Sequence, residues 1–287
     1  KIQTYEPEDI TLSKRKKFLK IKKGIWKGKY FFDLYKKACT PYKWHHSAFK
    51  IAKKYKKIIF SSPFSIKAVD FLEKFNVPAY KIASFEITDY NLINYIASKK
   101  KPIIISTGMA SIKEIKSAIK IIEKYHKKII ILHCVSNYPT KIKDTNLKKI
   151  NILKQKFKKY HIGLSDHTDN IFSSIASIPL GVCAIEKHFT IDSQKTPDSL
   201  FSIGPKMMKD LKDSSVELFE SLNKHKEIKV LNKNIKFRRS IYAKNNIGIN
   251  EKITDKNIIA LRPKIGICAS QYYKIIGKKL KKNIKVN

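Results

Sequence analysis

Apolar runs of strand length alternate with longer amphipathic segments along the first three quarters of the chain. The runs are rich in β-branched residues and show little alternation, which is typical of strands covered on both faces of a parallel sheet. The segments between them repeat apolar residues at helical spacing. The pattern predicts strands at 1–4, 58–64, 79–86, 102–109, 128–139, 161–167 and 183–189, and helices at 30–38, 42–55, 90–98, 112–125, 146–157, 170–180 and 205–222.

Seven strands that alternate with helices indicate a (β/α)8 TIM barrel, although this fold needs one more β/α unit than the seven found here. The chain begins at Lys1 without an initiator methionine, and KIQTY reads as the end of a strand. We therefore expect the first β/α unit to be missing. Because such a barrel would have open strand edges, we expect this chain alone to fold poorly or to be inactive. Full turnover by the isolated chain would refute that expectation.

The last quarter of the chain has a different pattern, with short strand-like runs, turns and no long helix. A polar, lysine-rich stretch separates it from the helix that ends near 222. We expect three parts: a barrel domain at 1–222, a linker at 223–236, and a small β-rich domain at 237–287.

Composition narrows the class of protein. The chain has 287 residues and a formal net charge of +38, which would suit nucleic acid or another anionic partner. The lysines are spread over nearly every predicted helix and form no stacking motif with aromatic residues, so we favour a solvated surface and expect no nucleic-acid partner. A nucleic-acid-binding protein would instead show tight and steeply salt-dependent binding. Attraction of anionic substrates remains a consequence of the charge.

Targeting and redox signals are sparse. No apolar run approaches 18 residues, so we expect no membrane span and no signal peptide. The four cysteines form no CxxC pair, which argues against disulfides and a cysteine-rich zinc site and favours a reducing cytoplasm.

Two histidines end neighbouring strands in the predicted barrel. His167 and His188 are 21 residues apart, about one repeat of a β/α array, and should lie at matching levels at the carboxyl ends of their strands. A single histidine at a strand end is more often only hydrogen-bonded. A matched pair flanked by Ser165 and Glu186 is a better candidate for a divalent metal site.

Polar residues follow almost every predicted strand, as expected for a ring of loops around an active site. Their hydroxyl and amide groups suit phosphate or carboxylate oxygens, and the glycine turn in STGM could cradle an anion. Lys81 is unusual because it lies in the middle of a strand. A lysine that faces the barrel interior implies a bound anion or a Schiff base, and the second possibility would make the protein a barrel aldolase.

The segments KIQTY, KIASFE, STGM, SNYP, GLSDH, EKHF and RRSIYA…LRP together resemble the sialic acid synthase family. The resemblance implies a (β/α)8 barrel with a C-terminal antifreeze-like (SAF) domain and a domain-swapped homodimer. It also implies condensation of phosphoenolpyruvate with an N-acetylated amino sugar to give a nine-carbon nonulosonic acid and phosphate. Within the family, GIWKGKYFFDLYKKACTPYKWHH is most similar to pseudaminic acid synthases, whose acceptor is 2,4-diacetamido-2,4,6-trideoxy-L-altrose. N-acetylneuraminate and legionaminic acid synthases are the alternatives.

The resemblance also implies roles for particular residues. Catalytic roles fall to Glu86, Glu186 and His188, and metal binding to His167 and His188, with Mn²⁺ the expected ion and Mg²⁺ or Co²⁺ as alternatives. Phosphoenolpyruvate would be held by Lys1, Ser62, Lys81, Ser84, Ser106, Asn137 and Ser165. The sugar would contact Gln3, Tyr138, Asp198, Glu86 and, from the partner subunit's small domain, Arg262. The family's first strand carries a functional glutamate, and that segment is absent from this chain.

Overall fold

The computed structural model describes residues 1–191, 195–223 and 234–286. The chain divides into two compact units, Lys1–Asn223 and Lys224–Asn287. The predicted linker at 223–236 lies mostly outside the described residues.

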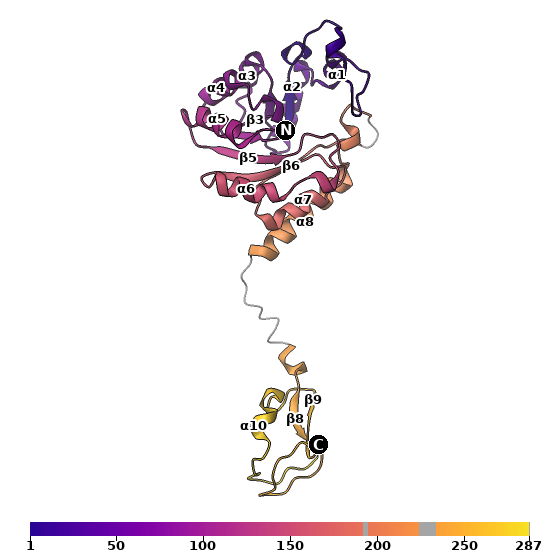
Figure 1. Cartoon of the computed structure of the whole chain (residues 1–287), viewed down its shortest axis with the longest axis vertical. Helices are drawn as coiled ribbons and strands as arrows, with labels where there is room; N and C mark the ends of the chain where they lie inside the picture. The colour runs from indigo at the N-terminus through magenta and orange to yellow at the C-terminus, as the bar shows by residue number, and fades with distance from the viewer. Residues whose placement is uncertain (192–194, 224–233, 287) are drawn as a thin grey trace. The chain divides into compact units, whose positions relative to one another are not determined.

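Unit 1 is built on a parallel sheet of seven strands that lie in the order of the sequence (Figure 1). Each strand pairs in parallel with the next, and the sheet curls as in a (β/α)8 barrel, which confirms the predicted fold class. The strands are β1 (Ile2–Thr4), β2 (Ser61–Pro63), β3 (Tyr80–Ile82), β4 (Ile103–Ser106), β5 (Ile129–Cys134), β6 (His161–Asp166) and β7 (Ile185–Lys187).

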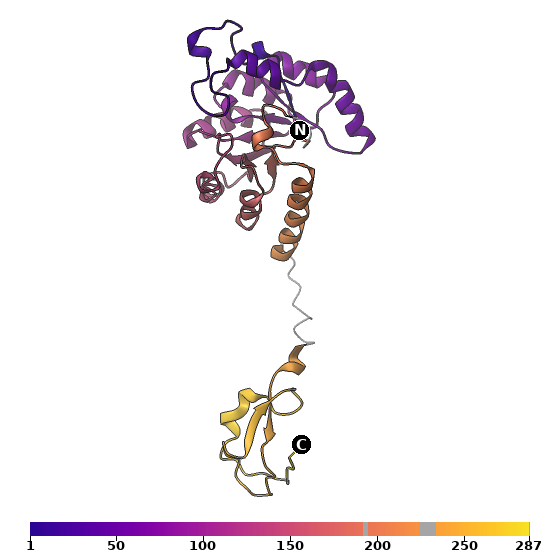
Figure 2. The same cartoon turned by 90° about the vertical axis from the view of Figure 1, so that its right-hand side faces the viewer.

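Helices connect the strands and lie outside the sheet (Figures 1 and 2). Their apolar faces pack against outward-pointing strand residues such as Ile103 and Ile105, which are fully buried in the main core. Three of the helices begin at side-chain caps, and the cap of α5 is a complete capping box between Ser111 and Glu114. The helices are α1 (Phe31–Ala38), α2 (Tyr42–Lys54), α3 (Ile66–Glu73), α4 (Tyr90–Ser98), α5 (Ile112–Glu123), α6 (Lys148–Lys156), α7 (Phe172–Ser177) and α8 (Pro205–Asn223).

All seven strands of unit 1 and several helices are shorter than predicted, and three of these differences have a clear cause. The strand predicted at 58–64 contains only β2, because its β1 partner is three residues long and Ile58 is 81% exposed. The strand predicted at 128–139 ends at Cys134, where the chain turns into the loop that carries Asn137. The helix predicted at 170–180 divides into α7 and the 3-10 turn Ile178–Leu180, since Pro179 cannot continue an α-helix.

The segment between β1 and α1 is an excursion with little regular structure, drawn in indigo in Figures 1 and 2. It contains two 3-10 turns, Pro7–Asp9 and Lys17–Leu19. The indole N–H of Trp26 donates to the carbonyl oxygen of Pro197 at 3.2 Å, which ties the excursion to the segment after β7.

Unit 2 contains an antiparallel pair of strands, β8 (Ser240–Ala243) and β9 (Ile258–Leu261). Three 3-10 or helical turns accompany them: Ile235–Phe237, Ala269–Gln271 and α10 (Tyr272–Ile275). Ile247, Ile253 and Ile258 form its own small core. The predicted β-rich tail is therefore present. None of the helices in the described residues of either unit is long and apolar enough to cross a membrane.

Candidate active site

The inner face of the curled sheet carries most of the polar residues predicted for the site. Residues that pair across neighbouring strands point to the same face, and every second residue along a strand shares it. The pairings place the predicted residues on one face from β1 to β7: Gln3 with Ser62, Lys81 with Ile104, Ser106 with Leu132, Cys134 with Ser165, and Ser165 with Glu186.

Lys81 lies at the centre of this face and is 2% exposed. Its Nζ donates to Ser106 Oγ at 2.7 Å and to the carbonyl oxygen of Ile82 at 3.0 Å. Its Nζ also lies 3.7 Å from Glu186 Oε2. Lys81 therefore faces the interior, one of the two orientations that its position in the middle of a strand leaves open.

Glu186 joins both lysines of the site. Its Oε1 lies 2.8 Å from Lys1 Nζ, and its Oε2 accepts a hydrogen bond from Ser165 Oγ at 2.7 Å. Burial alone would raise the pKa of Glu186, but the charges of Lys81 and Lys1 outweigh burial and hold the pKa well below its usual range. Burial lowers the pKa of Lys81, and the charge of Glu186 opposes that shift. Two ammonium groups thus face one carboxylate, which leaves an excess of positive charge.

Unsatisfied or crowded hydroxyl groups surround the lysines. Ser62 Oγ is buried and has no hydrogen-bond partner in the part of the chain that the structure describes. Gly108, at φ +44°, lies so close to its neighbours that a Cβ there would be 2.5 Å from Ser84 Cβ and 2.6 Å from Ser136 Oγ. Only glycine fits this turn, and it brings the STGM loop against two serines. Such hydroxyls are suited to anionic oxygens.

The two predicted metal ligands lie side by side. The ring centroids of His167 and His188 are 5.3 Å apart. His167 Nδ1 lies 2.8 Å from the carbonyl oxygen of Val135, and His188 Nδ1 lies 3.3 Å from Asp198 Oδ2. Because a carbonyl only accepts, His167 Nδ1 carries the proton, and a neutral ring then has its lone pair on Nε2.

This donor set fits a divalent ion with two imidazole ligands. Each Nδ1 is engaged by an oxygen atom, which is how ligating histidines are usually oriented, and each Nε2 is left for the ion. Burial lowers the pKa of His188, which favours the neutral form that a metal requires. No group of three or more His, Cys, Asp or Glu side chains suited to a metal occurs within residues 1–191, 195–223 and 234–286.

Glu86 follows β3 in the 3-10 turn Ser84–Glu86. Its Oε2 is buried and, among the described residues, without a hydrogen-bond partner. Burial raises the pKa of Glu86 to about 7, against the opposing charge of Lys81. A carboxyl group with this pKa can hold or release a proton at neutral pH.

The remaining predicted residues differ in how closely they join this group. Gln3 lies on the inner face of β1, and Asn137 is exposed in the loop after β5. The ring of Tyr138 packs on His167, with centroids 4.4 Å apart. Asp198 lies 3.3 Å from His188 Nδ1 and has a side chain that is 39% exposed, and its contact with the sugar stays a prediction. Arg262 follows β9 in unit 2, so its relation to this site stays a prediction.

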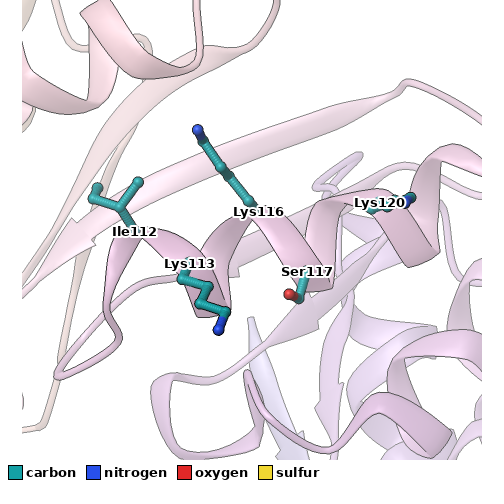
Figure 3. Close-up of a pocket in the computed structure, with 5 residues that line it drawn as sticks. All are labelled: Ile112, Lys113, Lys116, Ser117 and Lys120. Atoms are coloured by element: carbon teal, nitrogen blue, oxygen red, sulfur yellow. The ribbon is translucent and has the colours of Figure 1, made fainter.

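A hollow on the surface of α5 lies apart from these residues. It is lined by Ile112, Lys113, Lys116, Ser117 and Lys120 (Figure 3). Lys113 and Lys116 point in opposite directions there, and the lining contains none of the predicted site residues. The chemistry belongs to the carboxyl ends of the strands, as in other barrels of this type.

Comparison with protein families matches residues 1–227 to the NeuB family and residues 238–286 to the SAF domain. The chain belongs to the NeuB family. The family resemblance inferred from the sequence motifs is therefore confirmed, and so is the SAF tail.

Curated relatives align with this NeuB-family chain over almost its whole length. The pseudaminic acid synthase of Campylobacter jejuni is 40% identical over 99% of the chain and 84% of the relative. The pseudaminic acid synthase of Helicobacter pylori is 40% identical over 100% of the chain and 86% of the relative. A crystal structure of N-acetylneuraminic acid synthetase from Leptospira borgpetersenii superposes with a TM-score of 0.65 at 31% identity, covering 69% of each chain.

Some members of the NeuB-family site were not predicted from the sequence. Cys134 lies on the inner face, where its Sγ accepts from Ser84 Oγ at 3.3 Å and lies 3.7 Å from His167 Nδ1. Burial would raise the pKa of this thiol, but the interaction with His167 outweighs it and lowers the pKa to about 7. The signal in the sequence was its position two residues before the Ser136-Asn137 pair at a strand end. Trp26 and Phe201, described below, carried no comparable signal.

Proposed function

We propose that this protein is a pseudaminic acid synthase, which condenses phosphoenolpyruvate with 2,4-diacetamido-2,4,6-trideoxy-L-altrose and releases phosphate. The names of the relatives support the reaction class and the acceptor. The observation that carries the proposal is the excess of positive charge that Lys1 and the buried Lys81 form around Glu186. A small, multiply charged anion such as phosphoenolpyruvate would complete this arrangement.

Lys81 and Lys1 would bind the phosphate and carboxylate of phosphoenolpyruvate together with the hydroxyl and amide groups of the inner face. The bound anion would take over hydrogen bonds that Lys81 now makes with Ser106, and it would give Ser62 Oγ a partner. The full set is Lys1, Ser62, Lys81, Ser84, Ser106, Asn137 and Ser165. Gln3, Glu86, Tyr138 and Asp198 would meet the sugar.

In the proposed reaction, C3 of phosphoenolpyruvate attacks the aldehyde carbon of the sugar and C2 becomes an oxocarbenium centre. Water adds to C2 and gives up one proton, which restores the proton lost to the aldehyde oxygen, and the tetrahedral intermediate then loses phosphate by cleavage of the C–O bond while its hydroxyl proton passes to the phosphate. The lysines stabilise the negative charge of the phosphate as it leaves. The aldehyde oxygen takes up a proton as the C–C bond forms, and Glu86, with its pKa of about 7, is suited to hold that proton. Glu186 fixes the ammonium groups in place.

Nε2 of His167 and Nε2 of His188 would hold a divalent ion, for which we propose Mn²⁺, with Mg²⁺ and Co²⁺ as alternatives. Such an ion supplies Lewis-acid polarisation of the aldehyde oxygen. Val135 and Asp198 would keep the two rings in the orientation that binding needs.

A domain-swapped homodimer is part of the proposal, with Arg262 of the SAF domain reaching the sugar in the partner subunit's barrel. A cytoplasmic location is also proposed, on the grounds that all four cysteines are free thiols. Deletion of residues 237–287 would then abolish turnover, whereas a SAF domain that only binds something else would leave barrel catalysis intact.

Phosphate release from phosphoenolpyruvate by the full-length protein tests the proposal directly. The assay uses Mn²⁺ or a chelator, and either the diacetamido-trideoxy-altrose or N-acetylmannosamine. Metal-dependent release with the altrose alone is the expected result. Release with N-acetylmannosamine would keep the family reaction and overturn the acceptor. Release that survives the chelator would overturn the metal.

A barrel aldolase that uses Lys81 as a Schiff base is the second candidate, because Lys81 is fully buried and burial lowers its pKa. Borohydride trapping of a covalent adduct at Lys81 would favour it. The present contacts of Nζ with Ser106 and Glu186 favour the anion-binding role.

A further inference from the structure

Three aromatic side chains from distant parts of the chain meet beside the two histidines. Trp26 comes from the excursion, Tyr138 from the loop after β5, and Phe201 from the 3-10 turn Ser199–Phe201 after β7. The Trp26 ring lies 6.1 Å from Tyr138 and 6.0 Å from Phe201, and the last two are 5.0 Å apart, centroid to centroid. We call these three residues the aromatic triad.

The aromatic triad adjoins the histidines directly. Tyr138 lies 4.4 Å from His167, and Phe201 lies 4.8 Å from His188, again between ring centroids. Phe201 is buried, whereas Trp26 and Tyr138 are only partly buried. Tyr138 and Phe201 contact the histidines, and Trp26 contacts Tyr138 and Phe201. Trp26 is thus the member of the aromatic triad farthest from the histidines. A substrate whose reacting carbon lies at the histidines would direct its other end toward Trp26.

The indole of Trp26 can offer only carbon to that end of the substrate. Its one polar group, the ring N–H, already donates to the carbonyl oxygen of Pro197 at 3.2 Å. In Figure 1 the indigo excursion that carries Trp26 lies next to the orange segment that contains this carbonyl. The hydrogen bond both fixes the ring and removes its capacity to bind a sugar hydroxyl.

We propose that Trp26 is a specificity-determining residue that selects an acceptor sugar with a methyl group at C6 over one with a hydroxymethyl group. This inference rests on the proposed function, which puts the aldehyde at the histidines and C6 at the far end of the chain of six carbons. A methyl group loses no hydrogen bond against an aromatic ring. A hydroxyl group there would lose its water without gaining a partner.

The excursion is also the part of the sequence in which GIWKGKY resembles pseudaminic acid synthases. The ring contacts of Trp26 with Tyr138 and Phe201 give that segment a physical task, because they attach it to the two rings that pack on the histidines. The aromatic contacts carry the inference, and the sequence resemblance agrees with it.

The test compares two acceptors that differ only at C6: 2,4-diacetamido-2,4,6-trideoxy-L-altrose and 2,4-diacetamido-2,4-dideoxy-L-altrose. The quantity measured is the ratio of kcat/KM for the two sugars with phosphoenolpyruvate and Mn²⁺. For the wild type we expect a preference for the 6-methyl sugar of about ten- to a hundredfold, the range in which an apolar site rejects an added hydroxyl. We expect Trp26→Ala to lower that ratio to within about threefold of unity and Trp26→Phe to keep most of it.

Trp44→Ala is the matched control, since the chain's only other tryptophan is 59% exposed on α2. It should leave the ratio unchanged. An equal fall of kcat/KM for both sugars in Trp26→Ala would overturn the inference, because it would make Trp26 an anchor of the excursion only. That result leaves the proposed function standing. A wild type that accepts N-acetylmannosamine and neither altrose would overturn the proposed function and this inference together.

Discussion

On both faces of strands β6 and β7 a carboxylate meets lysine side chains, but the charges are balanced on one face only. On the outer face, Lys187 Nζ lies 3.0 Å from Asp166 Oδ2 and donates to the carbonyl oxygen of Thr168 at 2.6 Å. Ser174 Oγ donates to the same Asp166 oxygen at 2.6 Å. One cation meets one carboxylate, both nearly without exposure, and their remaining polar atoms are largely engaged.

On the inner face, Glu186 meets two lysines, and the hydroxyl of Ser62 has no partner among the described residues. Burying an ion costs free energy unless the ion is paired and hydrogen-bonded. The two faces should therefore differ in what they contribute to stability and to anion binding. Loss of one member of the outer network would leave a buried ion unpaired, and the network fixes the backbone next to His167 and His188. The incomplete inner network keeps a binding capacity for an anion. Substitutions on each face separate these two contributions.

Breaking the outer pair should have the largest effect on stability. Lys187→Met leaves the Asp166 carboxylate buried without its partner, and we expect the free energy of unfolding to fall by about 3–5 kcal/mol. Chemical denaturation measures it. The double variant Asp166→Leu/Lys187→Met should recover most of the loss, because neither ion is then left alone. Lys101→Met, which breaks the partly exposed pair with Glu73, is the control and should cost about 1 kcal/mol or less. A loss for Lys187→Met as small as that would contradict the comparison.

The same substitution on the inner face should leave stability nearly unchanged and remove activity. Lys81→Met eliminates an ammonium group that burial disfavours, while Glu186 keeps Lys1 and Ser165. We expect kcat/KM for phosphoenolpyruvate to fall about 10²–10³-fold, the usual loss for one charge-stabilising donor. Phosphate release and a denaturation curve of the same sample test both parts. An inner-face variant as unstable as Lys187→Met would mean that Lys81 is structural.

The contrast between the two faces also limits what the sequence could reveal. His167, His188, Lys81 and Glu186 were predictable because they lie at strand ends or at a fixed alternation along short strands, and period 2 decides their face. Trp26 was not predictable in this way, because the excursion has almost no periodic pattern and its position depends on one contact with Pro197. Asp166 and Lys187 carry no signal in the sequence beyond their places next to the two histidines. Their partnership depends on the pairing of Asp166 with Lys187 between β6 and β7, a register that the sequence does not state.

The pH dependence of stability should have opposite signs for a carboxyl group near the inner site and one outside it. Burial raises the pKa of Glu86 to about 7, above its unfolded value, so the folded state holds the proton more tightly. The contribution of Glu86 to stability is therefore fully present below about pH 4.5 and is lost as the pH rises to about 7, by up to about 3 kcal/mol. The difference in unfolding free energy between the wild type and Glu86→Gln, measured from pH 4.5 to 8, isolates this change.

Glu73→Gln is the matched control for that measurement. Although burial would raise the pKa of Glu73, hydrogen bonds from Lys101 and Tyr80 outweigh it and lower the pKa. Its contribution is present above the unfolded pKa and is lost as the pH falls through the lowered value. A wild-type minus Glu86→Gln difference that stays flat across pH 4.5–8 would show that the Glu86 carboxyl is better solvated than its buried Oε2 indicates.

The smallest effect should come from deleting one hydroxyl on each face. Ser174 Oγ donates to Asp166, so Ser174→Ala removes a hydrogen bond to a charged group, and we expect a loss of stability of about 1–3 kcal/mol with KM unchanged. Ser62 Oγ has no partner to lose in the described part of the chain, so Ser62→Ala should leave stability the same or slightly higher. It should raise KM for phosphoenolpyruvate up to about tenfold, since the hydroxyl finds its partner only in the bound anion. If Ser62→Ala lost stability and kept its KM, an unsatisfied group on the inner face would no longer indicate a binding role.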